Sequence, residues 1–170
     1  MLTSRALIAA ILPLAVAVQN AHAAEMTARL VDPDWDGVKI PQAHVCKLAG
    51  AASPMSPRIQ VENIPAEATK IVVAFNDESY PKLATDGGHG KISVAVKAGT
   101  IIVPSVPSES DSIPDGVKIE AKHRSTTSGY YLAPCSRGRG HTYAAEIQAV
   151  KSGLLGSSVV GQVRLQLGSY

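Results

Sequence analysis

The chain has 170 residues, of which 16 are basic and 14 acidic, and it contains two cysteines, one Trp, one Phe and five Tyr. A chain of this length is expected to form one compact domain, which excludes large multidomain enzymes. Its formal net charge of +2 is too small and too dispersed to be the electrostatic footprint of a nucleic-acid-binding protein, so nucleic acid is not an expected partner.

The first 23 residues have the features of a secretory signal peptide. Arg5 precedes an apolar run over residues 6–18, and a small-residue cleavage site ends at Ala23. A membrane span is the alternative, but the run contains Pro13 and is shorter than the roughly 20 apolar residues that a bilayer requires. We therefore predict a periplasmic or secreted protein whose mature domain, residues 24–170, has no transmembrane segment.

Export changes the expected state of the cysteines. Cys46 and Cys135 are the only pair, and an oxidising compartment allows them to form a disulfide. Closing so long a loop would contribute on the order of 4 kcal/mol to stability in the chain-entropy view. The alternative is two separate buried thiols.

Strand patterns dominate the mature chain. Alternating or β-branched apolar segments occur, in chain order, at residues 26–31, 70–76, 91–96, 100–103, 117–121, 142–150 and 158–167. Prolines and glycines fill the intervals, which leaves no room for the crossover helices of a parallel sheet. A possible helical turn at residues 66–69 is too short to shape the fold. We therefore predict a mainly β fold with mostly antiparallel strands.

Three of the seven aromatic residues lie within residues 130–143. A turn-rich loop over residues 133–140 leads into a strand that is predicted to begin at His141. Because alternate residues of a strand share a face, His141 and Tyr143 should point the same way, into an apolar row. This arrangement indicates the rim of a pocket; the alternative is a polar pair at the edge of the core, satisfied by backbone groups.

A second cluster of polar residues begins with Asp77, at the end of a predicted strand. It includes His89, which directly follows two glycines. With His141 these residues supply one carboxylate and two imidazoles, which suits a metal site, an acid–base pair or an anion pocket. Their spacing matches no dense metal signature, and no serine has the context of a hydrolase nucleophile. The residues alone leave these alternatives open.

Several short motifs occur along residues 40–170. No single motif identifies a protein family, but their order and spacing together are specific. They are an Ile-Pro to Cys element at residues 40–46, a Ser-Pro turn and strand at residues 56–59, an Asn-Ile-Pro to Thr-Lys lead at residues 63–70, Asp77 to Pro81, His89, a Tyr-Leu-Ala-Pro-Cys element at residues 131–135, His141-Thr142-Tyr143, and an ending at residues 161–170. This series resembles the phosphatidylethanolamine-binding protein (PEBP) family, in its bacterial Raf-kinase-inhibitor-like branch.

The resemblance implies one domain with a large antiparallel sheet packed with a smaller sheet, a few short helices, and a shallow pocket for a small anion or phospholipid headgroup. Two imidazoles and a phenol can donate hydrogen bonds to anionic oxygens, and a carboxylate can orient a histidine. No metal or other cofactor is expected. The ligand-binding residues carried over from the family pattern are Asp77, His89, Tyr131, Ala133, Pro134, His141 and Tyr143.

The sequence departs from the family pattern around this pocket. The departures are Glu78 and Ser79 for Pro and Asp, Gly90 for Trp, Ala133 for Gly, and Ser136 and Arg137 for two prolines. A Glu78 side chain facing the pocket would repel an anion, and Arg137 and Arg139 could offset that repulsion or be solvated. The loss of the tryptophan and the aspartate predicts weak affinity.

Three classes of function are therefore considered. The favoured one is an exported, non-enzymatic binding protein for a small anion, a phospho-headgroup or a phosphorylated peptide. The second is an acid–base hydrolase in which Asp77 positions His89 or His141. The third is an inhibitor or interaction protein with a degenerate pocket, which would meet a protein partner through loops such as residues 105–112.

Overall fold

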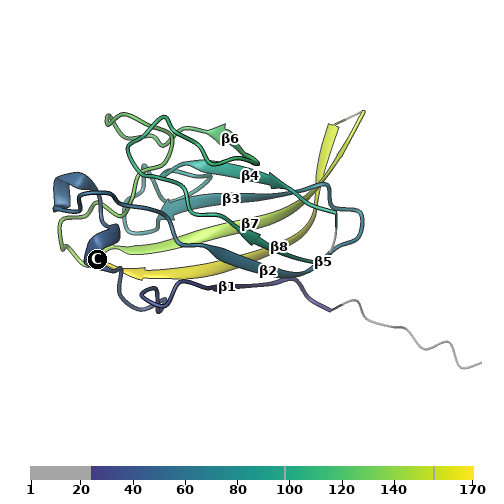
Figure 1. Ribbon diagram of the computed structural model, residues 1–170, viewed down its shortest axis with the longest axis horizontal. Helices are drawn as coiled ribbons and strands as arrows, with labels where there is room; N and C mark the ends of the chain where they lie inside the picture. Colours follow the sequence, from purple (N-terminus) through teal and green to yellow (C-terminus); the bar gives the residue numbers. More distant parts are fainter. Residues whose placement is uncertain (1–23, 98, 155) are drawn as a thin grey trace, which may run out of the picture.

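The computed structural model shows two antiparallel β-sheets, which confirms the predicted fold class (Figure 1). It describes residues 24–97, 99–154 and 156–170, so the predicted signal peptide lies outside the described residues. The larger sheet has the order β6-β4-β3-β7-β8, with β3 (Lys70–Asp77), β4 (Lys91–Ala95), β6 (Val117–Ala121), β7 (Thr142–Gly153) and β8 (Gly156–Ser169). The smaller has the order β1-β2-β5, with β1 (Thr27–Leu30), β2 (Ile59–Ile64) and β5 (Gly99–Val103).

One strand, β2, was missed by the pattern of apolar residues, although the family resemblance indicated a strand at Ile59. The alternation along β2 is short because its register with β5 shifts between Val61 and Ile64. Asn63 has a φ of 55° at this irregularity, a left-handed conformation that interrupts regular pairing. Every other strand lies on a predicted segment, with ends that differ by a few residues.

The core lies against the central strands of the larger sheet. Strand β3 is buried from Ile71 to Asp77, which accounts for its continuous apolar run in place of alternation. In β7 the alternate residues Tyr143, Ala145 and Ile147 are buried, which confirms the predicted inward row. This strand begins at Thr142, as the apolar pattern predicted, and His141 lies one residue before it.

Within the described residues, helical structure is limited to two single 3₁₀ turns, η1 (Gln42–His44) and η2 (Lys47–Ala49). The segment at residues 66–69 is a turn, in which Ala68 N–H donates to the carbonyl of Pro65 at 3.0 Å. Across the described ranges, no helix has the length and apolar character needed to cross a bilayer.

Cys46 and Cys135 form a disulfide, as predicted, with their Cα atoms 5.1 Å apart. The bond joins the residue before η2 to the loop that precedes β7. Beside it, the Cys46 N–H donates to the carbonyl of Pro134 at 2.9 Å. Both 3₁₀ turns and this loop lie at the same end of the molecule as the C-terminus, where β3 ends and β7 begins (Figure 1).

Candidate functional site

An open cleft of about 480 Å³ lies at this end of the larger sheet. Three of the predicted site residues, Asp77, His89 and His141, belong to its wall. They come from the end of β3, the segment before β4 and the residue before β7, and antiparallel pairing of Asp77 with Tyr143 brings these segments together. The other lining residues are Leu48, Tyr80, Leu83, Ser125, Thr126, Thr127, Leu132, Cys135, Ser136, Arg137 and Arg139.

Asp77 and His141 form a direct hydrogen-bonded pair. The Nδ1 atom of His141 lies 2.7 Å from Oδ2 of Asp77, and the second carboxylate oxygen accepts the N–H of Ser79 at 3.1 Å. The carboxylate is buried, whereas 22% of the imidazole surface is exposed. The bond therefore keeps a proton on Nδ1 and leaves Nε2 of His141 available to the cleft.

His89 is almost fully buried and lies deeper in the wall. Its Nδ1–H donates to the carbonyl oxygen of Leu132 at 2.8 Å. Burial lowers the pKa of His89, while the Leu132 carbonyl and the charge of Asp77 act in the opposite direction. The ring is accordingly neutral at neutral pH.

Tyr143 lies behind the cleft wall and supports the loop. Its hydroxyl oxygen accepts the backbone N–H groups of Cys135 and Ser136, each at 3.1 Å. Burial raises the pKa of Tyr143 to about 12, so the phenol keeps its proton. Its ring meets that of His89 edge-on, with centroids 5.5 Å apart. The Tyr143 hydroxyl is thus engaged by the loop backbone, and Tyr143 is not among the described residues that line the cleft.

The remaining predicted residues also lie beneath the cleft. Tyr131 is buried and packs edge-on against Phe75, with centroids 4.8 Å apart. The N–H of Ala133 donates to Oγ of Ser108 at 2.7 Å, and the Pro134 carbonyl accepts a hydrogen bond from the N–H of Cys46. These groups are used in holding the loop, which the family pattern alone did not reveal.

Arg137 and Arg139 give the cleft its positive charge. Both are exposed and line it, and neither guanidinium makes an ion pair within the described residues. Glu78 does not counter them, because both of its carboxylate oxygens bind Arg164, at 2.7 and 2.5 Å. The side chain of Glu78 therefore faces Arg164 and is not part of the cleft lining, so the condition for repulsion is not met. In the sequence, the only indication that both arginines line the cleft was their position in the loop after Cys135.

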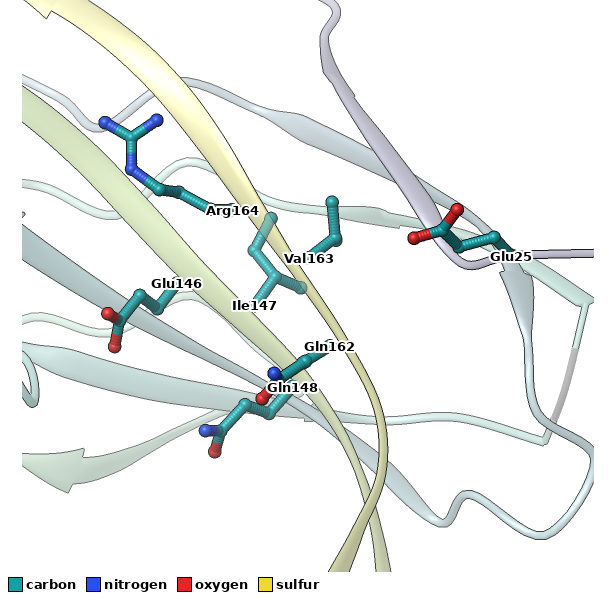
Figure 2. A pocket seen from close by; sticks show the side chains of 7 residues that line it. All are labelled: Glu25, Glu146, Ile147, Gln148, Gln162, Val163 and Arg164. Atoms are coloured by element: carbon teal, nitrogen blue, oxygen red, sulfur yellow. The ribbon is translucent and has the colours of Figure 1, made fainter.

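A second hollow, of about 400 Å³, opens along β7 and β8 (Figure 2). It contains none of the predicted site residues, and its guanidinium, that of Arg164, is already bound to Glu78. Glu25 and Glu146 add two carboxylates to its lining. The cleft at Asp77 is therefore the stronger candidate for binding an anion.

Metal binding is not indicated in the described part of the chain, where no group of three or more His, Cys, Asp or Glu side chains is placed to hold an ion.

Comparisons with known proteins add no assignment: no protein-family model matches the chain, and no curated protein matches it. The function is therefore inferred from the chemistry of the cleft.

Acidification should destabilise the protein through His89. The unfolded imidazole titrates near its ordinary pKa of 6.5, whereas burial lowers that of the folded protein. Between these two values the unfolded state binds the extra proton, so stability falls as the pH decreases below about 6.5, by at most about 1.4 kcal/mol per pH unit from this group. Urea unfolding at several pH values measures the slope.

The variant His89→Met isolates this contribution, because it removes the titrating ring. Its pH slope should be shallower than that of the wild type, while His44→Gln, a histidine outside the cleft, should keep the steeper slope. The charged or titrating neighbours of His89 are Asp77, His123 and His141. An identical slope in wild type and His89→Met would contradict the assignment of the effect to His89.

Proposed function

We propose that the protein is an exported, non-enzymatic binding protein whose cleft takes a small anion or a phospho-headgroup. The main support for this proposal is that His89, the Asp77–His141 pair and two guanidinium groups line one open cleft. The guanidinium groups of Arg137 and Arg139 outnumber the carboxylate of Asp77 in the cleft lining, which gives the cleft a net positive charge. Such a surface attracts anions.

Each group has a chemical role in this proposal. The guanidinium groups offer planar pairs of donors that match phosphate oxygens. His141, held by Asp77 through Nδ1, offers Nε2 as a further hydrogen-bonding atom at the cleft. Ser125 and the two threonines beside it add hydroxyl groups to the cleft lining.

We further propose that the protein belongs to the PEBP family, in the bacterial Raf-kinase-inhibitor-like branch. The order of motifs along residues 40–170 supports this, and the architecture that the family implies, a large antiparallel sheet with a smaller one, agrees with the observed pair of sheets. A periplasmic or secreted location agrees with the disulfide between Cys46 and Cys135.

Isothermal titration with phosphate, phosphoethanolamine and acetate tests the binding function. His141→Ala should weaken binding of phosphate by about 10-fold to 100-fold, the loss expected for a charged hydrogen bond. The double variant Arg137→Ala with Arg139→Ala should weaken it similarly, and should also reduce its dependence on salt.

Arg29→Ala is the matched control, since Arg29 is an exposed arginine of β1 that binds Gln60 and does not line the cleft. It should leave the affinity unchanged. The absence of binding by all three ligands to the wild-type protein would overturn the proposal. An equal loss in the Arg29 control would assign the effect to net charge and not to the cleft.

The Asp77–His141 contact favours one second candidate, an acid–base hydrolase. Here Asp77 would orient the imidazole, and Nε2 of His141 would take a proton from a water molecule that attacks the substrate. Phosphorus NMR of phosphoethanolamine incubated with the protein separates the two functions. An unchanged spectrum supports binding alone, whereas release of inorganic phosphate, abolished by His141→Ala, would establish the enzyme.

A further inference from the structure

His89 presents a buried hydrogen-bond acceptor at the cleft. Because the carbonyl of Leu132 can only accept a hydrogen bond, the 2.8 Å contact places the ring proton on Nδ1. In the neutral ring Nε2 then carries a lone pair. That nitrogen is buried and has no partner among the described residues, although His89 is part of the cleft wall. An unsatisfied buried acceptor is costly, so Nε2 points to a ligand that donates a hydrogen.

The cleft lining contains both acceptors and donors. Of its buried groups, the Asp77 carboxylate already accepts from His141 and Ser79, whereas Nε2 of His89 is an acceptor without a partner among the described residues. Of its exposed groups, the guanidiniums of Arg137 and Arg139 can only donate, and the hydroxyl groups of Thr126 and Thr127 can donate or accept. A ligand that satisfies this lining needs negatively charged oxygens for the arginines and, close to them, a hydrogen for Nε2 of His89.

We propose that the cleft selects oxyanions that still carry a hydrogen-bond donor, with hydrogen phosphate as the simplest, over fully deprotonated anions such as sulfate. The proposal rests on the proposed anion-binding function and specifies its ligand class. Hydrogen phosphate can donate its hydroxyl to Nε2 of His89, whereas sulfate would place an oxygen lone pair against a nitrogen lone pair. Phosphoethanolamine meets the same requirement through its ammonium group.

Phosphate and sulfate form a matched pair of probes at about pH 8, well above the ordinary pKa of imidazole. Both are tetrahedral dianions there, and they differ in one hydrogen. In isothermal titration of the purified protein, phosphate should bind about tenfold or more tightly than sulfate, the effect expected when a buried acceptor lacks its donor.

The outcomes separate this inference from the proposed function. Equal affinity for phosphate and sulfate would overturn the selectivity and leave the anion-binding function intact. No binding of either anion would overturn both.

Variants assign the selectivity to one nitrogen. His89→Met removes the acceptor, so the ratio of phosphate to sulfate affinity should fall toward one. His44→Gln is the matched control, because Nδ1 of His44 is also buried without a partner among the described residues but lies outside the cleft wall. It should keep the wild-type ratio, and loss of the ratio in this control would overturn the assignment to His89.

A spectroscopic readout on the wild-type protein does not depend on how the variants fold. Long-range proton–nitrogen NMR of the imidazole rings should show Nε2 of His89 unprotonated at about pH 8. Phosphate should shift this resonance, and sulfate should not. A protonated Nε2 in the ligand-free protein, or an equal shift with both anions, would overturn the inference.

Discussion

Replacing both cysteines, as Cys46→Ala with Cys135→Ala, should lower the free energy of unfolding by about 2–5 kcal/mol. The bond spans 89 residues of sequence, so its removal releases a long loop in the unfolded chain. It also removes the covalent tie between η2 and the loop that carries Arg137 and Arg139. We therefore expect weaker phosphate binding as well as lower stability.

Urea unfolding of the double variant measures the loss. The reduced wild-type protein is the matched control, because it keeps both sulfur atoms while the bond is open, and it should lose a similar free energy. A double variant as stable as the oxidised wild type, to within about 0.5 kcal/mol, would show that the remaining contacts hold the loop without the bond.

Gly90→Ala should destabilise the protein by about 2–5 kcal/mol, from a strained backbone and a steric clash. Gly90 has a φ of +114°, and a Cβ there would lie 2.6 Å from the carbonyl oxygen of Tyr130 and 3.1 Å from the Cα of Tyr131. Both neighbours are backbone atoms, which cannot rotate away. The same approach leaves no space for the tryptophan that the family pattern has at this position.

The control for Gly90→Ala is Gly116→Ala. Gly116 also has a positive φ, +80°, but a Cβ there meets no atom within 4 Å. Gly116→Ala should lower the free energy of unfolding only by the cost of the backbone conformation, about 1 kcal/mol. Thermal and urea unfolding of the two variants give the comparison. Equal losses in the free energy of unfolding would mean that the segment carrying Tyr130 and Tyr131 moves aside at little cost.

The strands were predictable because each has a local pattern that its burial in the structure explains. The continuous apolar run of β3 corresponds to a central strand, and the alternation after Thr142 corresponds to the inward row of β7. Strand β2 was not predictable in this way. Its irregular register at Asn63 depends on pairing with β5, which lies far away in the sequence.

The candidate site was predictable in its residues but not in their individual roles. The pairing of Asp77 with His141 follows from the positions of two strand ends, which the sequence indicates. The contacts of the Tyr143 hydroxyl do not, because they are made to the backbone amides of Cys135 and Ser136, whose positions depend on the path of the loop. Likewise, the exposure of Arg137 depends on a loop backbone with a φ of 58° at that residue.

The double hydrogen bond to the Tyr143 hydroxyl has a consequence for the kinetics of exchange. The first turn of the loop is fixed at two successive amides and by the disulfide at Cys135, so it cannot act as a hinged lid. Under the proposed binding function, loading and release would need no closing step of this turn, and the association rate would depend on diffusion and on the field of Arg137 and Arg139. We would then expect the cleft to exchange its anion quickly and to follow changes in the concentration of anions around it.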